Sequence, residues 1–249
     1  MSKLLMVVAA LAWIAGVLRM QAQIDERDSA SVAATFGLTG SITRGTLNRT
    51  LVVGTIDAIA RDSVVGTRVT VNGTYGTFGR LTTERDVMAR MFGYVWTSKV
   101  VYPYAMMWME RSVRRSIAAR WQPGIGATWV LVSDANFSVR VSATASYDVV
   151  EFVRVLPDGR QRLAQFRPIA RVAARWRSTG AGLVASAEGW IQPSLQGTGI
   201  RQFLDCQVSA PLSQWLALRA SVMTIDEPLI PAGASTYDLY ASAGLALSL

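Results

Sequence analysis

Four arginines lie within the otherwise mostly apolar stretch 164–178, AQFRPIARVAARWRS. They occupy odd positions, and every even position from 164 to 176 is apolar. Guanidinium groups bind carboxylates and phosphates through paired N–H donors. Strict alternation predicts a strand with one cationic face and one apolar face. The arginines are Arg167, Arg171, Arg175 and Arg177.

The absence of histidine restricts the enzymes that the chain can resemble. A Ser-His-Asp triad cannot form, and metal sites built on imidazole are excluded. The chain has one cysteine, Cys206, which excludes an intramolecular disulfide and a thiolate zinc cluster. We interpret Cys206 as a small buried hydrophobic residue. We therefore expect no catalysis, no cofactor and no metal.

Two carboxylate pairs are the remaining candidates for chemistry. Glu84 and Asp86 share one face of an alternating segment, and Asp226 and Glu227 lie near the end of another. Paired carboxylates can bind calcium or hydrolyse glycosides. The simpler interpretation is that they neutralise inward-facing arginines or lie in polar loops, and we favour it.

The first residues predict an export signal. Lys3 supplies a positive charge, residues 4–17 are apolar, and Met20-Gln21-Ala22 is an acceptable cleavage site. A membrane anchor is the alternative, but the apolar run is shorter than the ~20 residues that a spanning helix needs. We therefore expect residues 1–22 to be a cleaved signal peptide and residues 23–249 to form one domain.

The basic charge gives a weak indication of partners. The net charge of +8 falls to +6 when Lys3 and Arg19 leave with the signal peptide. Basic patches often bind nucleic acid, but an exported protein rarely meets it, and these charges are spread along the chain. Anionic lipid headgroups and lipopolysaccharide are the better candidates.

Alternation with a period of two extends along most of the chain. Turn-forming clusters such as Pro157-Asp158-Gly159-Arg160 separate the alternating segments. After residue 23 no segment has the ~18 uninterrupted apolar residues of a spanning helix. The twelve predicted strands cover residues 30–42, 46–60, 65–78, 81–97, 99–113, 115–132, 135–155, 161–177, 181–192, 199–212, 214–226 and 234–249.

Long strands with one apolar face suit a barrel in a membrane, where every backbone polar group must be paired within the protein. A soluble barrel shows the same alternation with its apolar face inside, so alternation alone leaves both open. Aromatic residues recur at each end of the apolar rows, as in the two girdles of an outer-membrane barrel. The expected interface aromatics are Trp121, Trp129, Phe137, Tyr147, Phe166, Trp176 and Tyr237.

We therefore favour an all-β fold, a single up-and-down antiparallel transmembrane β-barrel in the outer membrane. The alternative is a soluble or periplasmic β-barrel that binds an apolar ligand. We expect a monomer that contacts outer-membrane lipid and lipopolysaccharide and is inserted by the barrel-assembly machinery.

In such a barrel the polar face lines the lumen, because an arginine facing lipid costs ~2–4 kcal/mol at the midplane. The lumen charges either pair and close the barrel or line a narrow passage that favours small anions. The expected function is therefore envelope structure or narrow-pore passage. The expected lumen-facing residues are Arg68, Asp86, Arg90, Arg120, Arg140, Asp148, Arg167, Arg171, Arg175, Glu188, Arg201, Asp205, Arg219 and Asp238.

The order of several motifs resembles a known family. Thr83-Glu84-Arg85-Asp86 precedes Val101-Tyr102-Pro103-Tyr104 and Met109-Glu110-Arg111-Ser112, and then Arg120 precedes Gly124-Ile125-Gly126. This order resembles the uncharacterised salt-induced outer-membrane protein family over about residues 30–130. The resemblance implies an outer-membrane β-barrel of a Gram-negative bacterium and no catalytic residues. Such barrels commonly end in an aromatic residue, whereas this chain ends in Leu249.

Overall fold

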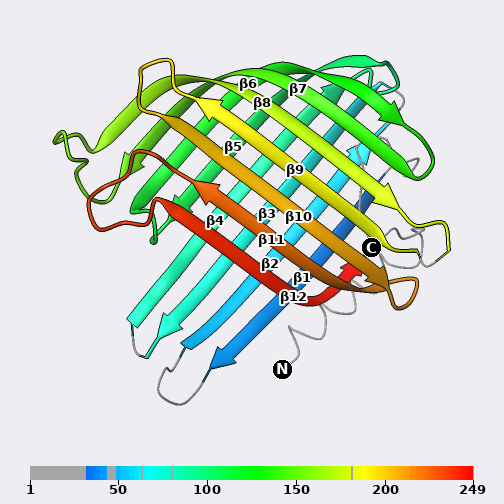
Figure 1. The fold of residues 1–249 in the computed structure, drawn as a ribbon, viewed down its shortest axis with the longest axis horizontal. Helices are drawn as coiled ribbons and strands as arrows, with labels where there is room; N and C mark the ends of the chain where they lie inside the picture. The colour runs from blue at the N-terminus through cyan, green and yellow to red at the C-terminus, as the bar shows by residue number, and fades with distance from the viewer. Residues whose placement is uncertain (1–31, 44–48, 63, 80, 181, 249) are drawn as a thin grey trace, which may run out of the picture.

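The computed structural model describes residues 32–43, 49–62, 64–79, 81–180 and 182–248; the predicted signal peptide lies outside them. Consecutive strands pair antiparallel, and β12 closes on β1 to complete a barrel (Figure 1). The prediction of twelve strands is confirmed, and no predicted boundary differs by more than three residues. The strands are β1 (Val32–Thr43), β2 (Arg49–Arg61), β3 (Val65–Phe78), β4 (Leu81–Val95), β5 (Val101–Ser112), β6 (Ile117–Ser133), β7 (Phe137–Phe152), β8 (Arg162–Arg177), β9 (Val184–Pro193), β10 (Ile200–Pro211), β11 (Leu216–Asp226) and β12 (Tyr237–Ser248).

The outer wall of the barrel is apolar, and its lumen holds the charged side chains. Ile125 and Leu204 point outward and are 70% and 42% exposed, whereas Arg120 and Arg201 are buried inside. This arrangement suits a barrel surrounded by lipid and is the reverse of a soluble barrel with an apolar interior. The chain is therefore an outer-membrane-type barrel, and the alternative of an interior apolar-ligand site is wrong.

The two ends of the barrel differ in the length of their connections. Residues 153–161 join β7 to β8, and residues 227–236 join β11 to β12. Both connections lie at the left of Figure 1, and we call this end the loop end. The opposite end, where β1 begins and β12 ends, carries shorter turns such as residues 134–136; we call it the terminal end.

The closure between β1 and β12 is short. Four register pairs, from Thr35 with Ser248 to Leu38 with Leu245, join these strands among the residues that the structure describes. By comparison, β1 and β2 pair from Val32 with Ala60 through Thr43. The barrel therefore has one seam that is held by far fewer backbone hydrogen bonds than its neighbouring strand pair.

Within the described ranges, no helix is long and apolar enough to cross a membrane.

Candidate functional site

Buried ion pairs cross the lumen near the loop end. Glu110 of β5 lies 2.9 Å from Arg120 of β6 and 3.1 Å from Arg201 of β10. Glu227, in the connection after β11, lies 2.5 Å from Arg120 and 3.3 Å from Arg201. Because these contacts join opposite walls, the side chains must fill the lumen between them. We call this set the ion-pair layer; its members are Glu110, Arg115, Arg120, Asp148, Arg167, Arg201 and Glu227.

Burial gives this layer its importance for stability. Asp148 lies 3.2 Å from both Arg120 and Arg167, and the side chains of Asp148 and Arg167 are 0% exposed. Taking charges out of water is costly, and only close partners of opposite sign compensate for it. Each member of the layer therefore depends on the others, and the described part of the layer has almost no contact with solvent.

The turn between β5 and β6 directs a further arginine into this layer. Ser116 has a φ of 54°, in the left-handed region that non-glycine residues rarely adopt. The Arg115 amide donates to the Ser112 hydroxyl at 3.2 Å, which holds the turn. The Arg115 side chain then forms ion pairs with Glu110 and, at 3.1 Å, with Asp238 of β12.

An aromatic cluster fills the lumen beside the ion-pair layer. Trp108 and Trp190 meet edge to face, with ring centroids 5.3 Å apart. The Trp108 indole donates to Glu110 at 3.3 Å, and the Trp190 indole donates to Glu188 at 2.5 Å. The two indoles thus connect the ion-pair layer with charges nearer the terminal end. The members of the cluster are Phe92, Tyr94, Tyr102, Tyr104, Trp108, Trp190 and Phe203.

Arginines lie against both sides of the aromatic cluster. The Arg201 guanidinium lies 4.3 Å from the centroid of the Trp108 ring, and the Arg90 guanidinium lies 4.7 Å from that of Phe203. Cations over aromatic faces are stabilised by the ring quadrupole, most strongly where water is excluded. The rings therefore help to accommodate the buried cations as well as filling space.

A polar cavity of about 70 Å³ lies beside the aromatic cluster, and its lining includes residues near the terminal ends of β7 and β8. Arg171 of β8 lies 2.8 Å from Glu188 of β9. Arg90 of β4 lies 3.4 Å from both Glu188 and Asp205 of β10, across the lumen. We call this cavity the arginine pocket; its charged lining residues are Asp57, Arg68, Arg90, Arg140, Arg171, Arg175, Glu188 and Asp205.

The structure places every predicted lumen residue on the inner side of the barrel, but in separate groups. Arg120, Asp148, Arg167 and Arg201 join the ion-pair layer, and Arg68, Arg90, Arg140, Arg171, Arg175, Glu188 and Asp205 line the arginine pocket. Asp86 and Asp238 lie near the loop end with Tyr240 and Arg114. Arg219 donates to Gln207 at 2.6 Å near the arginine pocket.

The predicted interface aromatics lie on the outer wall. Their exposed fractions range from 40% for Tyr147 to 53% for Phe166 and Tyr237. The Tyr147 and Phe166 rings meet edge to face, with centroids 5.0 Å apart. The other members are Trp121, Trp129, Phe137 and Trp176.

The carboxylate pairs serve as partners for other side chains. Glu84 lies 3.7 Å from Arg114, and Asp86 accepts from the Val113 amide at 2.7 Å. Glu227 turns inward to the ion-pair layer, whereas Asp226 ends β11. Among the described residues, no group of three or more His, Cys, Asp or Glu side chains is arranged to hold a metal.

Sequence reasoning missed several residues that carry this arrangement. Glu110 and Arg115 lie at the centre of the ion-pair layer, and neither is among the predicted lumen-facing residues. The prediction that Glu227 neutralises inward-facing arginines is confirmed by its contact with Arg120. The aromatic cluster was not predicted because both faces of β5 are apolar up to Met109, and because Phe92 and Tyr94 follow the charged residues Glu84, Asp86 and Arg90 on the inner face of β4. One signal was available: Phe203 interrupts the polar face of β10, and its ring lies in the cluster.

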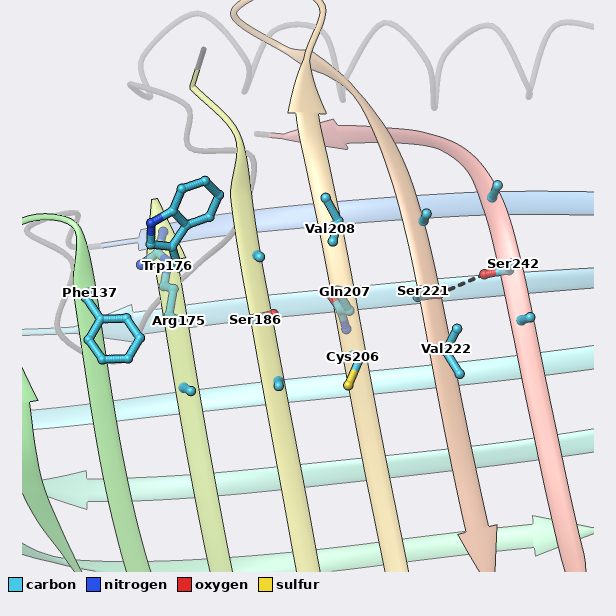
Figure 2. Close-up of a pocket in the computed structure, with 16 residues that line it drawn as sticks. Phe137, Arg175, Trp176, Ser186, Cys206, Gln207, Val208, Ser221, Val222 and Ser242 are labelled. Carbon is cyan, nitrogen blue, oxygen red and sulfur yellow. Dashed lines mark hydrogen bonds between the residues drawn. The ribbon is translucent and has the colours of Figure 1, made fainter. Parts of the chain in front are cut away.

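A groove of about 740 Å³ crosses the outer wall of β8–β12 (Figure 2). Its floor consists of small side chains, since Ala187 pairs with both Ala174 and Cys206. Phe137 and Trp176 lie at one side of it. Cys206 faces the outer side of the barrel, in the groove. It is only partly buried, because its small neighbours cannot cover its side chain. The prediction that Cys206 is a buried residue is therefore wrong.

Several solved structures resemble the barrel. The first, described as the NanC porin, has a TM-score of 0.49 and 7% identity, covering 87% of this chain and 97% of that one. The translocator domain of the autotransporter NalP from Neisseria meningitidis has a TM-score of 0.49 and 10% identity, covering 90% and 89%. A bacterial polysaccharide outer membrane secretin has a TM-score of 0.41 and 9% identity, covering 88% and 97%.

No family model and no curated protein matches the chain. The resemblance to the salt-induced outer-membrane protein family stays a prediction.

Proposed function

We propose that this protein is an outer-membrane β-barrel with a structural role, whose lumen is closed by the ion-pair layer in its resting form. The observation that carries the proposal is the contact of Glu110 with Arg201 across the lumen. Side chains that are 0–1% exposed and joined across opposite walls leave little room for a water-filled path. The aromatic cluster adds a second obstruction beside this layer.

The distribution of apolar side chains supports a location in the outer membrane. An outer wall that exposes Leu81 and Ile125 needs lipid around it. Bacterial outer-membrane barrels carry longer loops outside and short turns in the periplasm. By this rule the connections 153–161 and 227–236 lie on the extracellular side of the membrane, and the terminal end lies on the periplasmic side. The expected partners are membrane lipid and lipopolysaccharide, with the barrel-assembly machinery acting during insertion of a monomer.

A non-catalytic role fits the use of the acidic residues. Glu110, Asp148 and Glu227 are each committed to arginines in the ion-pair layer. A general acid or base needs access to a substrate, and these carboxylates are only 0–2% exposed. The chain has no histidine, the side chain that most often acts as a general acid or base. The carboxylates of the ion-pair layer, which could act instead, are shielded from solvent.

Planar-bilayer recording tests the closed lumen directly. Purified protein is inserted into the bilayer, and insertion is verified by protease protection and by heat-modifiable migration of the same vesicles. We expect no stepwise conductance from inserted wild-type protein. Conductance steps would contradict the closed barrel. Recovery of the protein from cells without detergent would contradict the membrane location.

Narrow passage of small anions is the second candidate, and the presence of five arginines in the lining of the arginine pocket favours it. If the wild type conducts, anion preference is measured from the reversal potential in a salt gradient. The Arg171→Glu variant should then lose that preference, because the change reverses the charge at a lining residue. Unchanged preference would show that these arginines do not set selectivity.

A further inference from the structure

Charged side chains on the outer wall of the barrel gather near the loop end. Within the strand residues whose side chains the structure describes, none faces outward at the terminal end. An arginine that faces lipid is most costly at the membrane midplane and costs little near an interface. These positions therefore mark the level at which lipid headgroups begin. The outward-facing charged residues are Arg85, Arg111, Glu151, Arg162 and Asp226.

Two of these residues, Arg85 of β4 and Arg111 of β5, are neighbours on the outer wall. Val87 is the register partner of Arg111. Because Arg85 lies two residues from Val87 on the same face, it is a diagonal neighbour of Arg111. Both arginines are exposed, whereas the residues before and after each of them are buried. We call Arg85 and Arg111 the outer arginine pair.

The register partners of the outer arginine pair are neutral. Arg85 lies opposite Tyr75 of β3, and Arg111 lies opposite Val87. Arg162 differs, because its register partner on β7 is Glu151. Like charges that share one face of a sheet repel each other. The outer arginine pair is therefore stabilised by an anion that approaches from outside the wall.

Aromatic side chains lie on both sides of the outer arginine pair. Tyr75 of β3 is 50% exposed, and Trp121 of β6 is 52% exposed. Trp121 is the register partner of Met109, which lies two residues from Arg111 on the same face. Tyrosine and tryptophan gather at the level of lipid headgroups, where one end of the ring system is apolar and the other is wet. The arginines therefore lie at headgroup depth.

The wall beside the outer arginine pair is apolar toward the middle of the strands. Val87 and Met91 of β4 face outward and are exposed, and Met107 and Met109 follow the same face of β5. Planar guanidinium groups match the oxygens of a phosphate. A ligand that meets arginines at one end and apolar side chains at the other must be amphipathic, so a phosphorylated lipid fits this face.

We propose that the outer arginine pair binds the phosphate groups of lipopolysaccharide, while the acyl chains lie along the outer wall of β4 and β5. The inference deepens the proposed function and rests on its orientation, in which the loop end lies on the extracellular side. Lipopolysaccharide carries its phosphates on lipid A, the part that enters the membrane. The bound lipid thus fixes the depth of the barrel at this edge of the wall.

Native mass spectrometry of the folded full chain in a neutral detergent tests the proposal. The probe is lipid A with both phosphates, and the reference is the same lipid A without phosphates. We expect the wild type to bind the phosphorylated form about tenfold or more tightly. Arg85→Gln and Arg111→Gln should each lose about fivefold of this preference, since a basic residue at the membrane surface contributes that much. Arg162→Gln, on the same wall beside Glu151, is the matched control and should keep the preference.

The comparison of the two lipids on the wild type needs no variant, and heat-modifiable migration reports that each variant is folded. Equal binding of both forms of lipid A by folded wild type overturns the proposal. An equal loss in the Arg162 variant also overturns it, because the effect is then one of general charge. If phosphatidylglycerol binds as tightly as lipid A, the assignment to lipopolysaccharide is wrong. Conductance and recovery without detergent do not depend on lipid phosphates, so failure of the proposed function is distinguishable.

Discussion

Arg201 on β10 and Glu110 on β5 meet at 3.1 Å in the lumen, although β6–β9 separate their strands on one side and β11–β12 with β1–β4 on the other. A direct contact between such distant strands requires the lumen to be narrow at this level. It also makes each charge dependent on its partner, because neither side chain has contact with bulk water.

Glu110→Gln should therefore destabilise the barrel strongly. The amide keeps the shape of the side chain but removes one of the carboxylates that neutralise Arg115, Arg120 and Arg201, so the buried arginines outnumber their remaining counter-charges. Breaking a buried pair costs about 3–5 kcal/mol. Urea unfolding in lipid vesicles, followed by tryptophan fluorescence, measures the loss. Arg160→Gln, which breaks the exposed pair with Asp158, should leave the midpoint unchanged. Equal midpoints for both variants would contradict the importance of the ion-pair layer.

The loss of unfolding free energy caused by a charge on the outer wall should depend on the depth of that charge in the membrane. Ile125 lies at the middle of β6, between Trp121 and Trp129, and is 70% exposed. Ile125→Arg should cost ~2–4 kcal/mol, whereas Leu131→Arg, near the end of the same strand, should cost ~0–1 kcal/mol. Equilibrium unfolding in vesicles compares the two. A larger loss at Leu131 would show that the membrane-facing band is placed wrongly.

Gly126 should not tolerate even a methyl group. A Cβ at this position would collide with the Ala143 carbonyl oxygen and lie 2.9 Å from the Thr144 Cα, and backbone atoms cannot move aside. Gly126→Ala should therefore cost at least the ~1–3 kcal/mol typical of overpacking. Gly93→Ala is the control, because its Cβ would meet nothing within 4 Å. Heat-modifiable migration and urea midpoints measure both; matching values would refute the close approach.

Asp62, in the turn between β2 and β3, should titrate below its usual range. Its Oδ1 accepts from the amides of Val65 and Val64, both at 2.7 Å, and these hydrogen bonds lower the pKa of Asp62 from its usual value of 3.8. A depressed pKa means that the turn is stabilised above pH 3.8 and loses this contribution as the pH falls through the lower value.

Carbon-13 NMR titration of the Asp62 carboxyl in micelles checks this sign. The midpoint should lie below 3.8, and Asp62→Asn should remove the pH dependence of the Val64 and Val65 amide shifts over the same range. A midpoint at or above 3.8 would show that the two hydrogen bonds do not form in solution.

The positions of the strands could be predicted from the sequence because the alternation that marks a strand lies within that strand and does not depend on its neighbours. In β8 the arginines and the apolar residues alternate without interruption, and the period of two fixes the orientation of every side chain. Turn chemistry then separates the strands. Closure of the barrel follows because an unpaired edge cannot face lipid.

The partners inside the lumen could not be predicted, since alternation says which side chains face inward and nothing about which of them meet. Glu227 contacts Arg120 of β6 because of the path of a connection, and a connection has no periodic pattern. The inward position of Trp108 was hidden for another reason: its neighbours Met107 and Met109 are also apolar, so the two faces of β5 look alike.

The seam between β1 and β12 determines how the barrel fails. Four register pairs hold it, from Thr35 with Ser248 to Leu38 with Leu245, and they join the two ends of the described chain. A contact between distant parts of a chain forms late, because its loop-closure entropy is largest. We therefore expect thermal opening to begin as separation of these two strands, so the lifetime of the barrel in a membrane depends on its shortest hydrogen-bond ladder and not on the average one.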